Sequence, residues 1–245
     1  MIHQRGIGLV ELLLSLFLAS VLICLLIEHY INAKKHYEQG NKRLEQAYEL
    51  SMLEELFRKS IQQAGFSPCL SMPYLNANSG DPGEKIKSIE ITGGQNTNLR
   101  INRMSEHFSR VFQMASDELW IIPGEDYEKD EWIIIADCSH MEVKQIASIA
   151  ASNNKKLIRL KKPLQFSYTM PVYLGQWISE QYFIKNNTSG ENTLYYQNGS
   201  HSEELSSIVQ SLSVVPIDRS NANLIQVSLG LKQEHVLLEI KIRAS

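Results

Sequence analysis

Residues 7–27 read IGLVELLLSLFLASVLICLLI, and every one of them is apolar or small except Glu11. As an α-helix this run would extend roughly 31 Å, which matches the hydrocarbon core of a bilayer. No other stretch of the sequence is comparable. One apolar segment at the start of a 245-residue chain predicts an anchored protein whose globular part lies on one side of a membrane.

The composition excludes several classes of protein. With 43% hydrophobic and 21% charged residues, the chain can form a packed core and is neither disordered nor collagen-like. Three cysteines are too few for a disulfide-rich miniature scaffold. The 24 basic and 27 acidic residues give a net charge of −3, whereas a dedicated nucleic-acid-binding protein usually carries a basic excess.

Three explanations compete for the apolar segment. A cleaved signal peptide has an apolar core of about 7–15 residues and a small-x-small site, but this run is longer and Glu28-His29-Tyr30 follows it. A plain signal anchor accounts for the length but gives no reason for Glu11. A carboxylate inside a membrane segment is costly and generally has a partner and a function. The third explanation therefore has to account for Glu11.

That third explanation uses the string QRGIGLVELL, from Gln4 to Leu13. It resembles the class III signal of type IV pilins and pseudopilins, in which a short basic leader ends in Gly and the following hydrophobic helix has Glu as its fifth residue. The resemblance implies a leader of residues 1–6, cleavage by a prepilin peptidase between Gly6 and Ile7, and N-methylation of Ile7. It also implies that Glu11 neutralises the new α-amine when a subunit docks into a filament.

A helical pattern continues over residues 28–65. Its first apolar positions recur every seven residues, at Tyr30, Tyr37 and Leu44. Others follow at three- to five-residue spacing, and charged or amide side chains fill the opposite face. This amphipathic half needs a surface to lie against, and we expect its aromatic side chains to serve in core packing. With Gly65 as the stop signal, one straight helix is predicted from Ile7 to Ala64.

Residues 66–245 are predicted to form a β-rich globular domain. Turn signals such as Gly93-Gly94 and Asn198-Gly199 separate short runs of β-forming residues. We predict strands at 86–91, 118–122, 132–136, 142–149, 156–160, 181–184, 193–196, 212–216, 224–231 and 236–243. A long N-terminal helix, half in the membrane and half packed on an antiparallel sheet, defines an α+β class.

Several further segments narrow the resemblance to one family of pilins. LFRKSIQQAGF at 56–66 leads to Cys69, SDELW stands at 116–120, and IIADC ends at Cys138. YFI at 182–184 leads to TLYY at 193–196, and EL at 204–205 leads to IVQSL at 208–212. This order resembles the PilW family of minor type IV pilins. The resemblance implies a type IV pilin-like fold without enzymatic activity or cofactor, in a protein that primes pilus assembly and lies at or near the pilus tip.

The resemblance also implies partners and a location. The partners would be other minor pilins, the major pilin, the prepilin peptidase, the inner-membrane assembly platform, a tip adhesin and the lipid bilayer. The chain would first lie in the inner membrane as a single-pass protein with its C-terminal domain in the periplasm, and later in the pilus. It would serve adhesion, motility or DNA uptake.

The three cysteines divide into two groups. Cys24 lies in the apolar segment, where a small packing role is expected. Cys69 and Cys138 lie in the domain that would be exported, and an oxidising compartment permits them to pair. Similar PilW-type proteins tend to carry Cys at these two places, which favours a disulfide. Two buried free thiols are the alternative.

Other candidate sites have weaker support. Carboxylates at 126, 128 and 130 could bind Ca²⁺, but the spacing is not that of an EF-hand and favours a solvated turn. One basic cluster, at 155, 156, 159, 161 and 162, could contact nucleic acid but favours a charged strand edge. The seven histidines fit no metal or catalytic motif. We therefore predict no catalytic residue, no metal site and no nucleic-acid partner.

Two alternative functions remain open at the level of sequence. A J-type pseudopilin of a type II secretion system would share the leader, the helix and a position near a tip. A membrane-anchored periplasmic binding module or enzyme belongs to another class of protein. It would keep an intact N-terminus and would bind or react through the exported domain alone.

Overall fold

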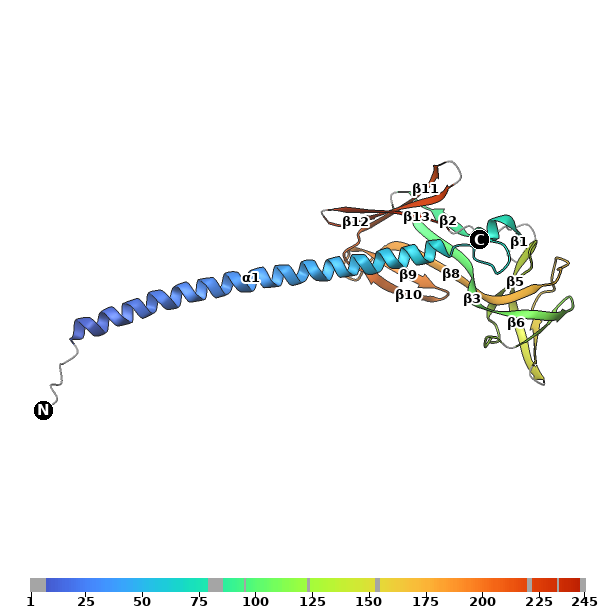
Figure 1. Cartoon of the computed structure of the whole chain (residues 1–245), viewed down its shortest axis with the longest axis horizontal. Coiled ribbons are helices and arrows are strands. Elements are labelled where there is room, and N and C mark those ends of the chain that lie inside the picture. Colours follow the sequence, from blue (N-terminus) through green and yellow to red (C-terminus); the bar gives the residue numbers. More distant parts are fainter. Residues whose placement is uncertain are drawn as a thin grey trace. The chain divides into compact units, whose positions relative to one another are not determined.

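The computed structural model describes residues 8–78, 86–94, 96–122, 124–152, 155–219, 222–232 and 234–242. Its first element is helix α1, Leu9–Gln62, which has 54 residues (Figure 1). Beyond its last turn, Gly65 adopts a φ of 72° and donates its N–H to the Asn102 carbonyl at 2.8 Å. The predicted helix and its glycine stop are therefore confirmed within the described residues. The chain divides into two compact units, residues 1–53 and 54–245.

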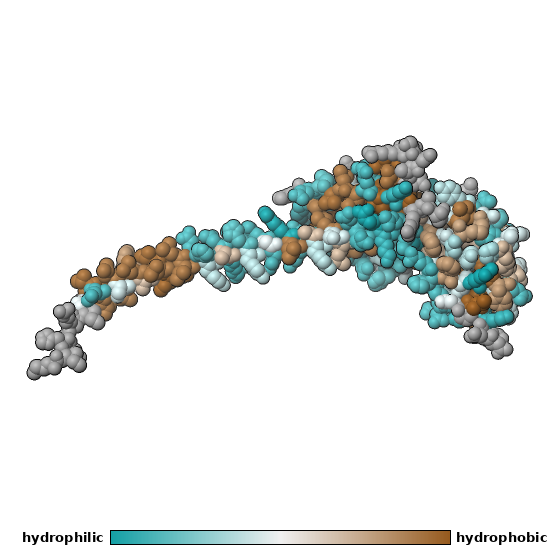
Figure 2. All heavy atoms as spheres, in the orientation of Figure 1, coloured by the Kyte–Doolittle hydropathy of each residue, from teal (hydrophilic) through white to brown (hydrophobic). Residues whose placement is uncertain are grey.

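From Leu9 onward the first unit is a single helix, and the side chains of residues 10–48 are exposed, whereas Leu53 at its end is buried. Apolar side chains cover the segment that begins at Val10, and polar side chains follow (Figure 2). The prediction of core packing is wrong for Tyr30, Tyr37 and Tyr48, each of which is about two-thirds exposed. Seven-residue spacing suits contact with another helix, and the chain supplies no second α-helix among its described residues.

The second unit is built mainly from antiparallel strands, so the predicted α+β class is confirmed. A 3₁₀ turn at Met72–Tyr74 precedes the first of them. The strands are β1 Asn76–Asn78, β2 Ile89–Thr92, β3 Asn98–Met114, β4 Glu118–Ile121, β5 Trp132–Ala136, β6 His140–Ser152, β7 Lys155–Leu160, β8 Val172–Asn186, β9 Asn192–Asn198, β10 His201–Ser206, β11 Ser211–Arg219, β12 Ala222–Gly230 and β13 His235–Lys241. β1 pairs in parallel with β6, and the other pairings are antiparallel.

Six of these strands form a closed ring of hydrogen-bonded neighbours. The order is β3, β4, β7, β6, β5 and β8, and β8 pairs again with β3. Every strand of the ring contributes to one apolar cluster, which includes Val111, Leu119, Ile133, Ile146, Ile158 and Val172. All six of these side chains are fully buried. The ring is thus a small barrel with a packed interior.

The long strands β3 and β8 extend beyond this barrel into a second sheet region with β2, β9 and β10. The last turns of α1 pack here. Phe57 and Ile61 are fully buried, and the Phe57 ring lies 4.7 Å from the ring of Tyr182 in β8. The amphipathic part of α1 therefore packs on a sheet, but only through its C-terminal turns.

A separate three-stranded sheet, in the order β11-β12-β13, completes the second unit. Thr97 connects it to the main sheet region. The Thr97 N–H donates to the Leu212 carbonyl at 2.8 Å, and the Thr97 hydroxyl accepts the Val214 N–H at 3.2 Å. One face of the small sheet is apolar and buried, through Leu212, Val214, Val227, Leu229 and Ile240.

The sequence-based strand assignment missed β1, β3 and β10, and it found only the end of β8. β3 lacks a clean alternation because Asn102, Ser105 and Ser109 are buried among its apolar residues. Their polar groups have partners: Asn102 Nδ2 donates to the Lys87 carbonyl at 2.8 Å, and Ser109 Oγ accepts the Tyr127 hydroxyl. β10 is an exposed edge strand of mostly polar residues, so it had no apolar face to detect.

Candidate functional site

The residues expected to carry processing and assembly lie at the start of the chain. The predicted cleavage residues Gly6 and Ile7 lie outside the described residues, so the cleavage and methylation sites stay predictions. Glu11 lies in the first turn of α1. The N–H groups of Glu11 and Leu12 both donate to the Gly8 carbonyl, at 2.9 and 3.3 Å. The helix therefore begins at Leu9, the third residue of the predicted mature chain, and includes Glu11.

The helix that follows Glu11 is long and apolar enough to span a membrane. Its most apolar window of 18 residues has a mean hydropathy of 2.8, and none of that window is buried within the chain. The hydroxyls of Ser15 and Ser20 donate to the carbonyls of Leu12 and Phe17, at 2.9 and 2.8 Å. These groups are satisfied within the helix, as a hydrocarbon environment requires.

Glu11 is thus the one charged side chain on the helix between residues 8 and 27. A carboxylate in the first helical turn interacts favourably with the positive end of the helix dipole. Its oxygens only accept hydrogen bonds when ionised, so a cation or an ammonium group is the natural partner in an apolar setting. The pairing of Glu11 with an α-amine stays a prediction.

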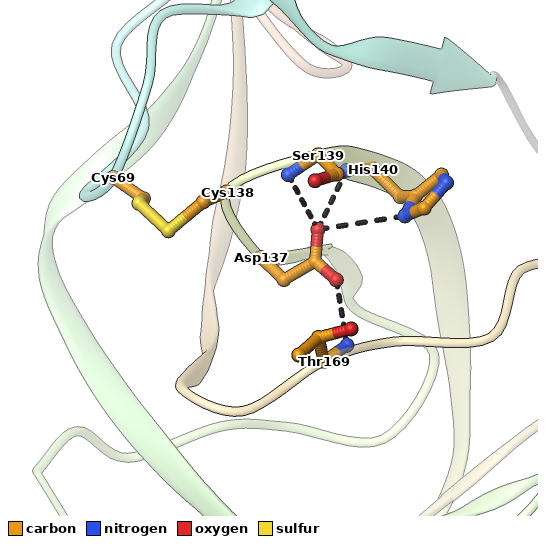
Figure 3. The surroundings of a disulfide bond; sticks show 6 residues. All are labelled: Cys69, Asp137, Cys138, Ser139, His140 and Thr169. Carbon is orange, nitrogen blue, oxygen red and sulfur yellow. Dashed lines mark hydrogen bonds and ion pairs between the residues drawn. A yellow bond between two sulfur atoms is a disulfide. The ribbon is translucent and has the colours of Figure 1, made fainter.

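The second candidate site is the predicted disulfide, which is present between Cys69 and Cys138 (Figure 3). It spans a sequence separation of 69 residues, and the two Cα atoms are 5.1 Å apart. The bond joins the segment that follows α1 to the turn between β5 and β6. Cys24 is a free, exposed thiol on the apolar helix.

A buried carboxylate that sequence reasoning missed lies beside this disulfide. Asp137 Oδ1 accepts the N–H groups of Ser139 and His140 at 2.7 and 2.6 Å, and Oδ2 accepts the Thr169 N–H at 2.8 Å (Figure 3). Burial acts to raise the pKa of Asp137, but the three N–H donors outweigh it and hold the pKa below its usual value. The carboxylate therefore fixes the turn that carries Cys138 to the segment that carries Thr169.

A second buried carboxylate holds the same segment from β6. Glu142 Oε1 accepts the N–H groups of Gln165 and Phe166, both at 2.8 Å. Glu142 Oε2 lies 2.7 Å from Lys144 Nζ, which also donates to the Pro163 carbonyl at 2.8 Å. Both ionic side chains are essentially inaccessible to solvent. Their oxygens and protons are directed at the backbone, so this cluster stabilises residues 163–169.

The basic and acidic clusters of the sequence neutralise each other. Lys156 Nζ lies 2.6 Å from Asp126, Arg159 Nε lies 2.8 Å from Glu118, and Lys161 Nζ lies 2.5 Å from Asp130. Two of the three carboxylates considered for Ca²⁺ thus have lysine partners. The basic cluster is likewise balanced by acidic neighbours, which weakens the case for either nucleic acid or calcium as a ligand.

Within the part of the chain that the structure describes, no group of three or more His, Cys, Asp or Glu side chains could hold a metal ion. His29 and His36 are both exposed on α1. No family model, curated protein or solved structure matches the chain. The observations therefore define a class, a β-rich domain on a membrane-capable N-terminal helix, and leave its function to inference.

Proposed function

We propose that this protein is a minor type IV pilin of the PilW type, which takes part in priming pilus assembly and in the tip complex. The observation that carries the proposal is the position of Glu11. It is the single carboxylate of the apolar segment, whose side chains from Val10 to Ile27 are exposed, and it lies five residues beyond Gly6. A plain anchor has no use for that charge, whereas a subunit that pairs it with an α-amine does.

The exposed continuation of the helix supports the same proposal. Beyond the apolar segment, Tyr30, Tyr37 and Leu44 keep a seven-residue spacing, and each side chain is about 70% exposed. Exposed apolar side chains at a seven-residue spacing suit contact with neighbouring helices in a bundle. In a filament these helices would come from other minor pilins and the major pilin.

The proposed route begins in the inner membrane. Prepilin peptidase would remove residues 1–6 and leave Ile7 as the methylated N-terminus. The assembly platform would then move the subunit into the filament, and the β-rich domain would contact partner pilins or a tip adhesin. In the periplasm an oxidising environment would maintain the Cys69–Cys138 disulfide.

The decisive experiment is mass spectrometry of the N-terminal peptide, from membranes of strains with and without the prepilin peptidase. We expect a methylated peptide that starts at Ile7 and that is lost without the peptidase. A chain that begins at Met1 in both strains would overturn the proposal and favour a membrane-anchored binding module or enzyme.

Processing by the peptidase does not distinguish a pilus from a type II secretion system. Deletion of the gene should therefore be scored in parallel for surface pili and for secreted proteins. We expect loss of pili with normal secretion. The opposite result would assign the chain as a J-type pseudopilin.

A further inference from the structure

The starting observation is a fork in the main sheet, along strand β8. On one side of β8, β5 pairs with residues 173–176 and β9 pairs with residues 180–186. Residues 177–179 lie between these two partners and have neither opposite them. A cavity of about 410 Å³ opens at this fork, a size that suits a small ligand.

Two tryptophans line the cavity. Ile133 and Gln176 are the last residues of β5 and β8 that pair, and Trp132 and Trp177 lie next to them on the two strands, where the strands separate. Both residues line the cavity. Trp132 is 49% exposed, so much of its indole is accessible to a ligand.

Polar side chains border the same cavity: Glu131, Gln176, Ser179 and Asn198. The Gln176 amide Nε2 donates to Glu131 Oε1, and Glu131 Oε2 accepts the Glu128 N–H at 2.8 Å. Glu131 therefore holds the amide of Gln176 in place. The cavity thus combines two indole rings with amide and hydroxyl groups that can donate and accept hydrogen bonds.

We propose that this fork is a saccharide-binding site. The C–H groups on one face of a sugar ring carry partial positive charge and pack on the electron-rich face of an indole. The ring hydroxyls would then exchange hydrogen bonds with the amides of Gln176 and Asn198. A peptide is the less favoured occupant because the unpaired part of β8 spans only three residues, fewer than the roughly five or six of a typical strand.

The test uses the full-length protein in micelles of a zwitterionic detergent, because a maltoside detergent would present sugar to the site. Saturation-transfer NMR is recorded with cellobiose, lactose and N,N′-diacetylchitobiose as probes, and dissociation constants follow from titration. The variants are Trp132→Ala and Gln176→Ala, both at exposed positions. Trp120→Ala, on β4 outside the cavity lining, is the matched control. Circular dichroism verifies the fold of each variant.

We expect saturation transfer to the ring protons of at least one disaccharide. Trp132→Ala should weaken its binding roughly tenfold, the loss of one stacking contact, and Gln176→Ala should weaken it as well. Trp120→Ala should leave binding unchanged. No transfer to any of the three sugars, or equal affinities in all variants, would overturn the proposal. Binding of a capped Val-Thr pentapeptide in place of sugars would overturn it in favour of a protein partner.

Discussion

The hydroxyl of Ser60 and the phenol of Tyr182 lie 2.8 Å apart in the interior of the second unit. Ser60 stands on the last turns of α1 and Tyr182 on β8, so this hydrogen bond joins elements that are 122 residues apart in sequence. Burial raises the pKa of Tyr182, and the phenol stays protonated at physiological pH. The pair therefore fixes the rotation and depth at which the helix end meets the sheet.

We predict that Tyr182→Phe destabilises the second unit by about 1–2 kcal/mol, because the Ser60 hydroxyl is left buried without this partner. Urea unfolding of the full-length protein in micelles, followed by tryptophan fluorescence, measures the change. Ser60→Ala combined with Tyr182→Phe should cost less than the sum of the single changes. Tyr74→Phe, at a 59% exposed side chain, is the control and should change nothing. Additive effects would show that the two hydroxyls do not interact.

The helix and its end were predictable because their signals are local. A run of apolar residues, a seven-residue spacing and Gly65 are read directly from neighbouring positions. The burial of its aromatic residues was not predictable, because it depends on which part of the helix meets the sheet. The Phe57 side chain is fully buried, whereas the side chains of Tyr30 and Tyr37 are exposed. An amphipathic pattern shows that a partner is required but not whether the same chain provides it.

The buried carboxylates show the same limit at the candidate site. The alternation of Glu142 and Lys144 with apolar residues on β6 is typical of a solvent-facing strand, yet both are buried. Their partners, such as the Gln165 N–H and the Pro163 carbonyl, come from a distant segment. The pairing of Cys69 with Cys138, by contrast, was favoured by the resemblance to PilW-type proteins, which tend to carry Cys at these two places.

The disulfide should contribute strongly to the stability of the second unit. Replacing both Cys69 and Cys138 by Ser releases a loop with a sequence separation of 69 residues. The chain-entropy model gives a loss of roughly 4 kcal/mol. Denaturant unfolding with and without a thiol reductant measures it, and the reductant should affect the parent chain but not the double variant. Cys24→Ser is the matched control and should behave like the parent chain.

Asp137 should make stability depend on acid pH. Its pKa is lowered in the folded chain, so its contribution is present above the ordinary value of 3.8 and is lost as the pH falls through the folded pKa. Asp137→Asn should cost about 1–3 kcal/mol at neutral pH, because an amide cannot accept all three N–H groups. The difference from the parent chain should shrink below about pH 4. The matched control is Asp117→Asn, at an exposed residue. A pH-independent difference would contradict the assignment.

The assembly role proposed for Glu11 predicts a defect in incorporation without a defect in folding. Glu11→Gln keeps the shape of the side chain but removes the charge that would pair with an α-amine, an interaction that is strong in an apolar setting. We expect normal amounts of folded protein in membranes and roughly tenfold less in sheared pili, for a pairing energy near 1.4 kcal/mol, measured by quantitative immunoblotting. Glu28→Gln, at the other end of the apolar segment, should be recovered normally because no amine is expected there. Equal recovery of both variants would remove Glu11 from the assembly mechanism and leave its position in the helix without an explanation.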